Sequence, residues 1–399
     1  FKVHNLDAFA SALCGDDQTW VANFSEVQDI QKAATFLQRL ASSPQLEDLE
    51  TSARPSGIRP AEPLAVLGHW PLHPLAEYVE AHKAFREVLS GLREPSESPR
   101  VLVYTCTSMT FCGGHGDRLN GMLSAFAIAL LSGRYFFIDS QRPVPFSLVL
   151  QPRDLDWRMF GTLAAMPASF NWNDNLAGFE RDPFHVLDHQ ANALRFVSNQ
   201  RLTPAALRAV PQRAEALGLL PRPRLHAELF HMLFRPSPAL QRRLDARALP
   251  GGRLIGIHFR AGDQMPQHWV DPPRHELTEV EQFLDCAESL EASLHWESHF
   301  VLFADTDRVL ENPRVRDLQQ SGKLIFPAQT DGLVHVDRSP ATLSVRGLLG
   351  VWADWWTLAF DVHALVLCHS GFGATALEIG PPRPAVLGQG CIPAEGSLS

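Results

Sequence analysis

Three segments of the chain place glycines and polar residues directly after predicted buried strands. They are Gly113-Gly-His-Gly-Asp-Arg-Leu-Asn120, His258-Phe-Arg-Ala-Gly-Asp263 and His369-Ser-Gly-Phe-Gly-Ala-Thr375. Glycines let a ligand approach the backbone, and the free N–H groups at the start of a following helix can bind an anion. An arginine such as Arg118 or Arg260 adds a fixed positive charge. Together the three segments predict a phosphate-binding site.

Other interpretations of these segments need patterns that the sequence lacks. Gly113, Gly114 and Gly116 do not have the G-x-G-x-x-G spacing, and no G-x-x-x-x-G-K-[ST] segment occurs. This argues against a dinucleotide-dependent oxidoreductase, although a simple tight turn explains the first glycine cluster equally well. Ser370 is not expected to be a hydrolase nucleophile, because Cys368 stands where the G-x-S-x-G elbow needs a glycine.

Histidine and cysteine residues lie near one another at two places in the sequence. His115 with Cys106 and Cys112, or His369 with Cys368, are conceivable metal ligands. No second C-x-x-C or H-x-x-x-H segment completes a tetrahedral set, so we expect structural or polar roles and no bound metal. The six cysteines are widely scattered, and their number decides neither their pairing nor the compartment.

Two features of the C-terminal third have both a structural and a functional interpretation. Trp352, Trp355 and Trp356 lie in a predicted helix, where a packed core face is favoured over a sugar-stacking platform. His335 and Asp337 lie in a polar loop before that helix, and the loop is equally compatible with a solvated surface and with an active-site lid.

Short apolar runs that alternate with longer amphipathic segments predict two α/β units. The first is a βαβ unit with strands at Val101–Tyr104 and Tyr135–Ile138 and a helix at Leu119–Leu131. A helical stretch over residues 225–249 is expected to follow. In the second unit the predicted strands are 254–257, 300–303, 324–326 and 364–367, and the predicted helices are 279–294 and 352–362.

These units divide the chain into three predicted parts. Residues 1–99 form a helical accessory region that ends in the linker Glu94-Pro-Ser-Glu-Ser-Pro99. Residues 100–250 and 251–399 form a first and a second Rossmann-like domain. The expected fold is therefore α/β, with two facing domains and an N-terminal helical extension. Ligands of such sheets bind outside the carboxyl ends of the strands, where the three polar segments lie.

The composition excludes several classes of function. The chain of 399 residues is 45% hydrophobic and 20% charged, which is typical of a folded globular protein. Its formal net charge of −9 argues against nucleic acid and anionic lipid as partners. No apolar run reaches the roughly 18 residues of a membrane span. Because the sequence begins with Phe1, we expect any membrane anchor to lie outside it.

Four segments resemble, in order, the motifs of one enzyme superfamily. Ile255-Gly-Ile-His-Phe-Arg-Ala-Gly-Asp263 is similar to the H-x-R-x-G-D type segment of the fucosyltransferase superfamily with the GT-B fold, which includes α1,2-, α1,6- and protein O-fucosyltransferases. Residues 113–130 resemble the early glycine loop and helix of the family, Phe303-Ala-Asp-Thr-Asp307 its T-D segment, and Leu367-Cys-His-Ser-Gly-Phe-Gly373 its late serine motif. The resemblance covers roughly residues 100–380.

The resemblance implies an inverting, metal-independent glycosyltransferase without a cofactor, which transfers fucose from GDP-fucose to a hydroxyl of a glycan or glycoprotein. Arg260 would bind the β-phosphate, His258 and Asp307 would lie near the guanine and ribose, and the first domain would lie on the acceptor side. The donor-binding residues that it implies are Gly114, Gly116, Arg118, His258, Asp305, Thr306, Asp307, Ser370, Gly371, Phe372 and Gly373.

The reaction chemistry agrees with this implication. Cleavage of the sugar–phosphate bond builds negative charge on the β-phosphate, and a permanently charged arginine such as Arg260 can stabilise it without a metal. The acceptor hydroxyl needs a carboxylate or a histidine, for which the catalytic candidates are Asp117, Asp263 and His335, in that order. Several relatives carry a neutral residue where this chain has Asp117, so its role as base or orienting group stays open.

Function and location have alternatives that the residues leave open. The main alternative is a non-catalytic nucleotide- or sugar-binding protein on the same scaffold, because a fold does not determine a function. The presence of both Arg260 and Asp307 favours the enzyme. In a eukaryote, the expected location of such an enzyme is the Golgi or the secretory lumen.

Overall fold

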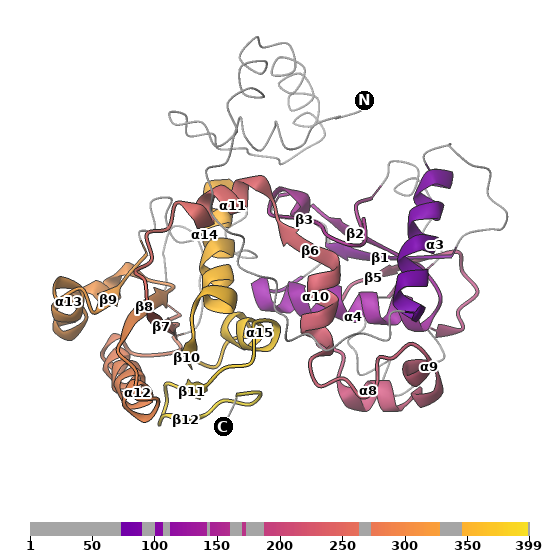
Figure 1. Ribbon diagram of the computed structural model, residues 1–399. Coiled ribbons are helices and arrows are strands. Elements are labelled where there is room, and N and C mark those ends of the chain that lie inside the picture. Colours follow the sequence, from indigo (N-terminus) through magenta and orange to yellow (C-terminus); the bar gives the residue numbers. More distant parts are fainter. Residues whose placement is uncertain are drawn as a thin grey trace, which may run out of the picture.

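The computed structural model describes residues 73–89, 100–106, 112–141, 144–159, 170–172, 187–262, 273–327 and 345–397. Two mainly parallel sheets, each flanked by helices, lie beside one another (Figure 1). The strand orders are β2-β1-β5-β4 in the first sheet and β12-β11-β10-β7-β8-β9 in the second. This confirms the predicted α/β class. Within the described ranges, no helix is both long enough and apolar enough to cross a membrane.

The first sheet is built around a buried central strand. Its strands, in sheet order, are β2 (Tyr135–Ser140), β1 (Val101–Cys106), β5 (Ala193–Phe196) and β4 (Phe170–Trp172). α4 (His115–Leu131) covers one face, and α3 (His73–Leu89) covers the other, where Phe85 packs with Val103 and Phe137. Because both faces are covered, all six side chains of β1 are buried, which explains its run of mostly apolar residues.

α3 is the described part of the predicted accessory region, and it lies directly against the first sheet. The Tyr78 hydroxyl donates to the Arg134 carbonyl over 2.9 Å and accepts the Phe136 N–H over 3.0 Å. His82 bonds the Phe136 carbonyl over 2.9 Å. α3 is therefore a layer of the first sheet, while the domain boundaries at residues 99 and 250 stay predictions.

The second sheet has a second core on one face and shares the first core on the other. Its strands, in sheet order, are β12 (Ile392–Pro393), β11 (Ala385–Leu387), β10 (Ala364–Leu367), β7 (Arg253–Phe259), β8 (Ser298–Ala304) and β9 (Leu324–Ile325). α12 (Val280–Ser293) and α13 (Pro313–Gln320) cover one face. α14 (Val345–Trp356) and α15 (Gly371–Ile379) cover the other, which faces the first sheet (Figure 1).

Further short elements lie outside the two sheets. They are a 3-10 turn (Phe146–Leu148), β3 (Leu150–Pro152), α8 (Pro204–Arg208), α9 (Pro211–Ala216), α10 (Leu225–Leu233), β6 (Phe234–Pro236) and α11 (Pro238–Asp245). The prediction of a helical stretch over residues 225–249 is wrong at β6, which pairs with β3. Pro236 lacks an N–H, and Ser237 caps the next helix by accepting the Leu240 N–H over 3.1 Å.

Two predicted helices begin earlier than the sequence indicated. The helix predicted from residue 119 begins at His115, with Gly114 as its N-cap. The helix predicted over 352–362 begins at Val345 and ends in a π-helical turn over Thr357–Asp361. The first turn of α4 contains Asp117, which caps the helix, and its polarity hid the helix start.

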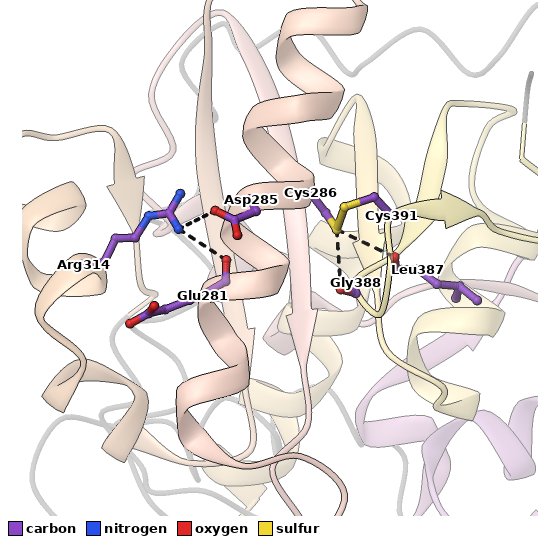
Figure 2. The surroundings of a disulfide bond; sticks show 7 residues. All are labelled: Glu281, Asp285, Cys286, Arg314, Leu387, Gly388 and Cys391. Carbon is purple, nitrogen blue, oxygen red and sulfur yellow. Dashed lines mark hydrogen bonds and ion pairs between the residues drawn. A yellow bond between two sulfur atoms is a disulfide. The ribbon is translucent and has the colours of Figure 1, made fainter.

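A disulfide ties the C-terminal segment to α12 (Figure 2). It joins Cys286 of α12 to Cys391, which lies between β11 and β12. The Cys286 sulfur lies 3.5 Å from the Gly388 carbonyl oxygen. On the other side of α12, Arg314 of α13 donates to the Asp285 carboxylate over 2.6 Å. α12 is thereby fixed to both neighbouring segments.

Candidate functional site

The carboxyl ends of three strands of the second sheet converge at Arg260. β7 lies between β10 and β8, and Arg260 directly follows β7. Its Nη1 atom lies 3.4 Å from Oγ of Ser370, which follows β10. Its Nε atom lies 3.9 Å from Oδ2 of Asp305, which follows β8. The structure thus brings together residues from three of the segments singled out in the sequence.

Asp305 holds the turn that carries Arg260. Its carboxylate accepts the N–H groups of Ala261 and Gly262 over 2.8 and 3.0 Å. Burial raises the pKa of Asp305, while these two N–H groups and Arg260 act in the opposite direction. Next to it, Thr306 is buried and accepts the Arg308 N–H over 3.3 Å, and Asp307 is exposed. Asp305 therefore acts on the site through the backbone of the Arg260 turn.

His258 is the next-to-last residue of β7, close to these strand ends. Its imidazole is buried and neutral. Burial, followed by the charges of Arg260 and His275, lowers its pKa from 6.5 to about 3. Its Nδ1 atom lies 3.4 Å from the Cys368 sulfur, and its ring centroid lies 5.0 Å from that of Phe372. A Cβ atom on Gly373 would lie 2.9 Å from the same Nδ1 atom. His258 can therefore offer hydrogen bonding to a ligand, but no positive charge at neutral pH.

The first turn of α15 lies beside Arg260. Ser370 is the N-cap, and its hydroxyl accepts the Phe372 N–H over 3.3 Å. Gly371 is exposed, so its backbone is accessible to a ligand. A helix N-terminus carries a partial positive charge, and Arg260 adds a full one. The arrangement is suited to binding a phosphate group.

The first turn of α4 is held by its own charged side chains. Gly113 has a φ of 72°, which favours glycine. Asp117 accepts the Gly114 N–H over 2.8 Å, and Arg118 donates from Nε to the Gly113 carbonyl over 3.0 Å. Asp117 thus caps the helix from its third position, as the glutamate of a capping box does.

The starts of α4 and α15 meet directly. A Cβ atom on Gly116 would lie 2.2 Å from the Gly371 carbonyl oxygen, so no side chain fits between the two backbones. The His115 ring centroid lies 4.1 Å from that of Trp352 and 5.2 Å from that of Phe372. The glycine segment of the first domain therefore lies at the same site as the serine segment of the second. The two remaining predicted site residues, Asp263 and His335, lie outside the described residues.

Sequence reasoning missed two features of this site. His115 is buried among aromatic side chains of the second domain, and its two ring nitrogens have no hydrogen-bond partner. Cys106 and Cys112 form a disulfide beside the glycine turn. The six-residue separation of these cysteines, directly before the glycines, was the available signal for the second feature.

The disulfide excludes a metal site built from His115, Cys106 and Cys112. At the other conceivable pair, burial raises the pKa of the Cys368 thiol to about 12, and its sulfur lies 3.4 Å from Nδ1 of His258. Among the residues that the structure describes, no group of three or more His, Cys, Asp or Glu side chains is placed to hold a metal ion.

Comparisons with known proteins address the fold. No protein-family model and no curated protein matches the sequence. A solved structure of an Arabidopsis thaliana FUT1 mutant in complex with GDP is similar, with 15% sequence identity, a TM-score of 0.52, and coverage of 82% of this chain and 80% of that chain. The chain has a fucosyltransferase-like fold.

Two further solved structures are similar to this chain with lower TM-scores. The NodZ α-1,6-fucosyltransferase soaked with GDP-fucose is 16% identical, with a TM-score of 0.44, over 72% of this chain and 95% of that chain. NodZ from Bradyrhizobium is 15% identical, with a TM-score of 0.45, over 73% of this chain and 96% of that chain. The FUT1 comparison, with its TM-score of 0.52, confirms the predicted GT-B fold.

Proposed function

We propose that this protein is an inverting, metal-independent glycosyltransferase that transfers fucose from GDP-fucose to a hydroxyl of a glycan or glycoprotein. One observation carries the proposal: Arg260 lies beside the exposed start of α15, 3.4 Å from its N-cap Ser370. A diphosphate bound there would meet a guanidinium and the positive end of a helix at once. The FUT1 structure with the same fold is a complex with GDP, which supports a guanine nucleotide as the ligand.

The leaving group determines what Arg260 does. When the bond between fucose and the β-phosphate breaks, negative charge grows on the departing GDP. Arg260 and the first N–H groups of α15 stabilise that charge, because they are fixed in place before the reaction. Asp305 keeps Arg260 in position through the turn at Ala261 and Gly262. His258, which is neutral, contributes hydrogen bonding near the nucleoside.

The acceptor hydroxyl attacks the sugar from the side opposite GDP, which inverts the anomeric centre. Asp117 of the first domain lies at this junction, but its carboxylate already accepts the Gly114 N–H. It is therefore proposed as an orienting group. The base would then be Asp263 or His335, and this assignment remains a proposal from the sequence.

Two disulfides support an oxidising compartment, because such bonds are rare in reducing cytosol. For a eukaryotic protein we place the activity in the Golgi or secretory lumen. Disulfide mapping of protein isolated from its native source tests this placement. Free thiols at all four cysteines would contradict it.

The experiment that tests the function combines ligand binding with turnover. GDP and GDP-fucose should raise the melting temperature, since a ligand at 100 times its Kd stabilises the native state by about 2.7 kcal/mol. UDP-sugars and NAD serve as matched controls and should have little effect. Transfer or slow hydrolysis of GDP-fucose in the presence of EDTA distinguishes the enzyme from a non-catalytic binding protein. Stabilisation by UDP-sugars alone, or a strict need for a divalent ion, would refute the proposal.

A further inference from the structure

The Cys106–Cys112 disulfide lies at the junction between the first sheet and the proposed site. Cys106 is the last residue of β1, where it pairs with Ser140 of β2. Cys112 directly precedes the Gly113 turn that starts α4. Both cysteines are buried, with relative exposures of 0% and 1%. The bond thus connects the last residue of β1 to the residue directly before the Gly113 turn.

The turn after Cys112 determines where two site residues lie. The Gly113 carbonyl accepts from Arg118, and the Gly114 N–H donates to Asp117. Two residues further on, Gly116 touches the Gly371 backbone of α15. A shift of Cys112 would therefore move Asp117 and Arg118 and separate Gly116 from the start of α15.

The two disulfides within the described residues differ in what they constrain. Cys286 and Cys391 are 105 residues apart, and their bond fixes the C-terminal segment on α12 (Figure 2). Cys106 and Cys112 are only 6 residues apart. A disulfide that closes a short loop removes less entropy from the unfolded chain than one that closes a long loop. The Cys106–Cys112 bond therefore contributes less to global stability than the Cys286–Cys391 bond. Its position points to a local role instead.

We infer that the Cys106–Cys112 disulfide is a positioning element of the active site, which holds the α4 N-terminus against α15. This inference rests on the proposed function. The proposed diphosphate site lies at Arg260 and the start of α15, whereas the bond lies beside the start of α4, so its loss should change the chemical step more than GDP binding. It is buried, and it therefore acts as a constant structural constraint on Asp117 and Arg118.

The test compares two double variants of the full chain. Cys106→Ala with Cys112→Ala should lower kcat with GDP-fucose roughly 10- to 100-fold, as expected for a misplacement of about 1 Å. The rise in melting temperature caused by GDP should stay as in the unmodified protein. Cys286→Ala with Cys391→Ala is the control, which should lower the melting temperature but leave kcat unchanged at temperatures where the protein is folded. An unchanged kcat in the first variant would overturn the inference.

A second variant covers the case in which the first pair does not fold. Gly113→Ala keeps both cysteines but would place a Cβ atom 2.5 Å from the Asp117 carboxylate. It should reduce kcat in the same way, with GDP binding intact. In addition, alkylation and mass spectrometry of the active protein should find no free thiol at Cys106 or Cys112. Full activity with free thiols there would overturn the inference, whereas no turnover by the unmodified protein would refute the proposed function itself.

Discussion

Gly116 and Gly371 touch backbone to backbone, where the first turns of α4 and α15 meet. A Cβ atom on Gly116 would lie 2.2 Å from the Gly371 carbonyl oxygen. Two helix N-termini, each with a partial positive charge, are thereby brought together beside Arg260. The contact thus fixes the first turn of α4, which Asp117 caps, beside the proposed diphosphate site at Arg260 and α15.

This contact predicts the effect of a single methyl group. Gly116→Ala should destabilise the protein by about 1–3 kcal/mol, because the backbone of α15 must move away. Activity should fall as well, since Asp117 is the next residue. Gly251→Ala is the matched control, because a Cβ atom there meets nothing within 4 Å. Thermal unfolding and initial rates of the two variants provide the measurement. Equal stability of the two variants would show that the domains do not meet at Gly116.

The role of Arg260 predicts a loss of rate without a loss of fold. Arg260→Ala should lose about 2.7–4 kcal/mol of transition-state stabilisation, which is 10²–10³ in kcat. Arg260→Lys keeps the charge but loses the planar fork, and it should also be severely impaired. The control is Arg253→Ala at the opposite end of β7, where the guanidinium lies over Trp296. If Arg260→Ala kept the kcat of the control, the β-phosphate assignment would fail.

Much of the fold could be predicted because burial leaves a clear pattern in the sequence. β1 and β10 are covered on both faces, so their sequences are short apolar runs with a polar residue or glycine just beyond. The small strands β4 and β5 were not predicted. β5 has only four residues, and Arg195 in its middle pairs with Asp139 of β2 over 3.6 Å. A run that short, with a charge inside it, has no periodicity to detect.

The site could be predicted in part for a different reason. In a parallel sheet the carboxyl ends of neighbouring strands lie at one edge, so His258, Asp305 and Ser370 had to come close together. The contact between Gly116 and Gly371 could not be found this way, because it joins two separate sheets. The sequence also could not show that the Asp117 carboxylate is already hydrogen-bonded, because the position of its partner, the Gly114 N–H, depends on the folded backbone.

Buried histidines predict a loss of stability in mild acid. Burial lowers the pKa of His115 and His258 from 6.5 to about 3, and that of His82 and His231 to about 4. These rings stay neutral in the native state, while the unfolded chain binds protons below pH 6.5, so stability falls as pH decreases from 6.5 towards 3. Between pH 7 and pH 5 each of His115 and His258 should cost on the order of 2 kcal/mol.

Urea unfolding at pH 7 and pH 5 checks this prediction. Carboxylates such as Asp305, whose pKa burial raises, act in the opposite direction, so the comparison with a histidine variant isolates the histidine contribution. His115→Phe keeps an aromatic ring beside Trp352 and Phe372 but cannot take up a proton. Its difference in stability between the two pH values should be smaller than that of the unmodified protein by on the order of 2 kcal/mol. The same pH dependence in both proteins would show that His115 is accessible to protons in the folded state.

The hydrogen bond between Asp117 and Gly114 bears on which of two roles this carboxylate has, a capping and orienting group or a general base. Because Oδ2 accepts the Gly114 N–H over 2.8 Å, the structure favours a capping and orienting role over that of a base. An asparagine oxygen can accept the same N–H, so Asp117→Asn should keep most of the activity and the stability. Asp117→Ala should lose about 0.5–2 kcal/mol of stability, as for other capping residues.

The two roles differ most in the rate of Asp117→Asn. If Asp117 is the general base, Asp117→Asn should lower kcat by roughly 10²–10⁴ with stability nearly unchanged. If Asp117 only orients, Asp117→Asn should change kcat little. Asp117→Ala should lower kcat more, because it weakens the start of α4. Initial rates with GDP-fucose, measured beside melting temperatures with and without GDP, separate these cases. A folded Asp117→Asn protein that binds GDP but does not turn over would make Asp117 the base, and the capping bond would then hold it ready for the acceptor hydroxyl.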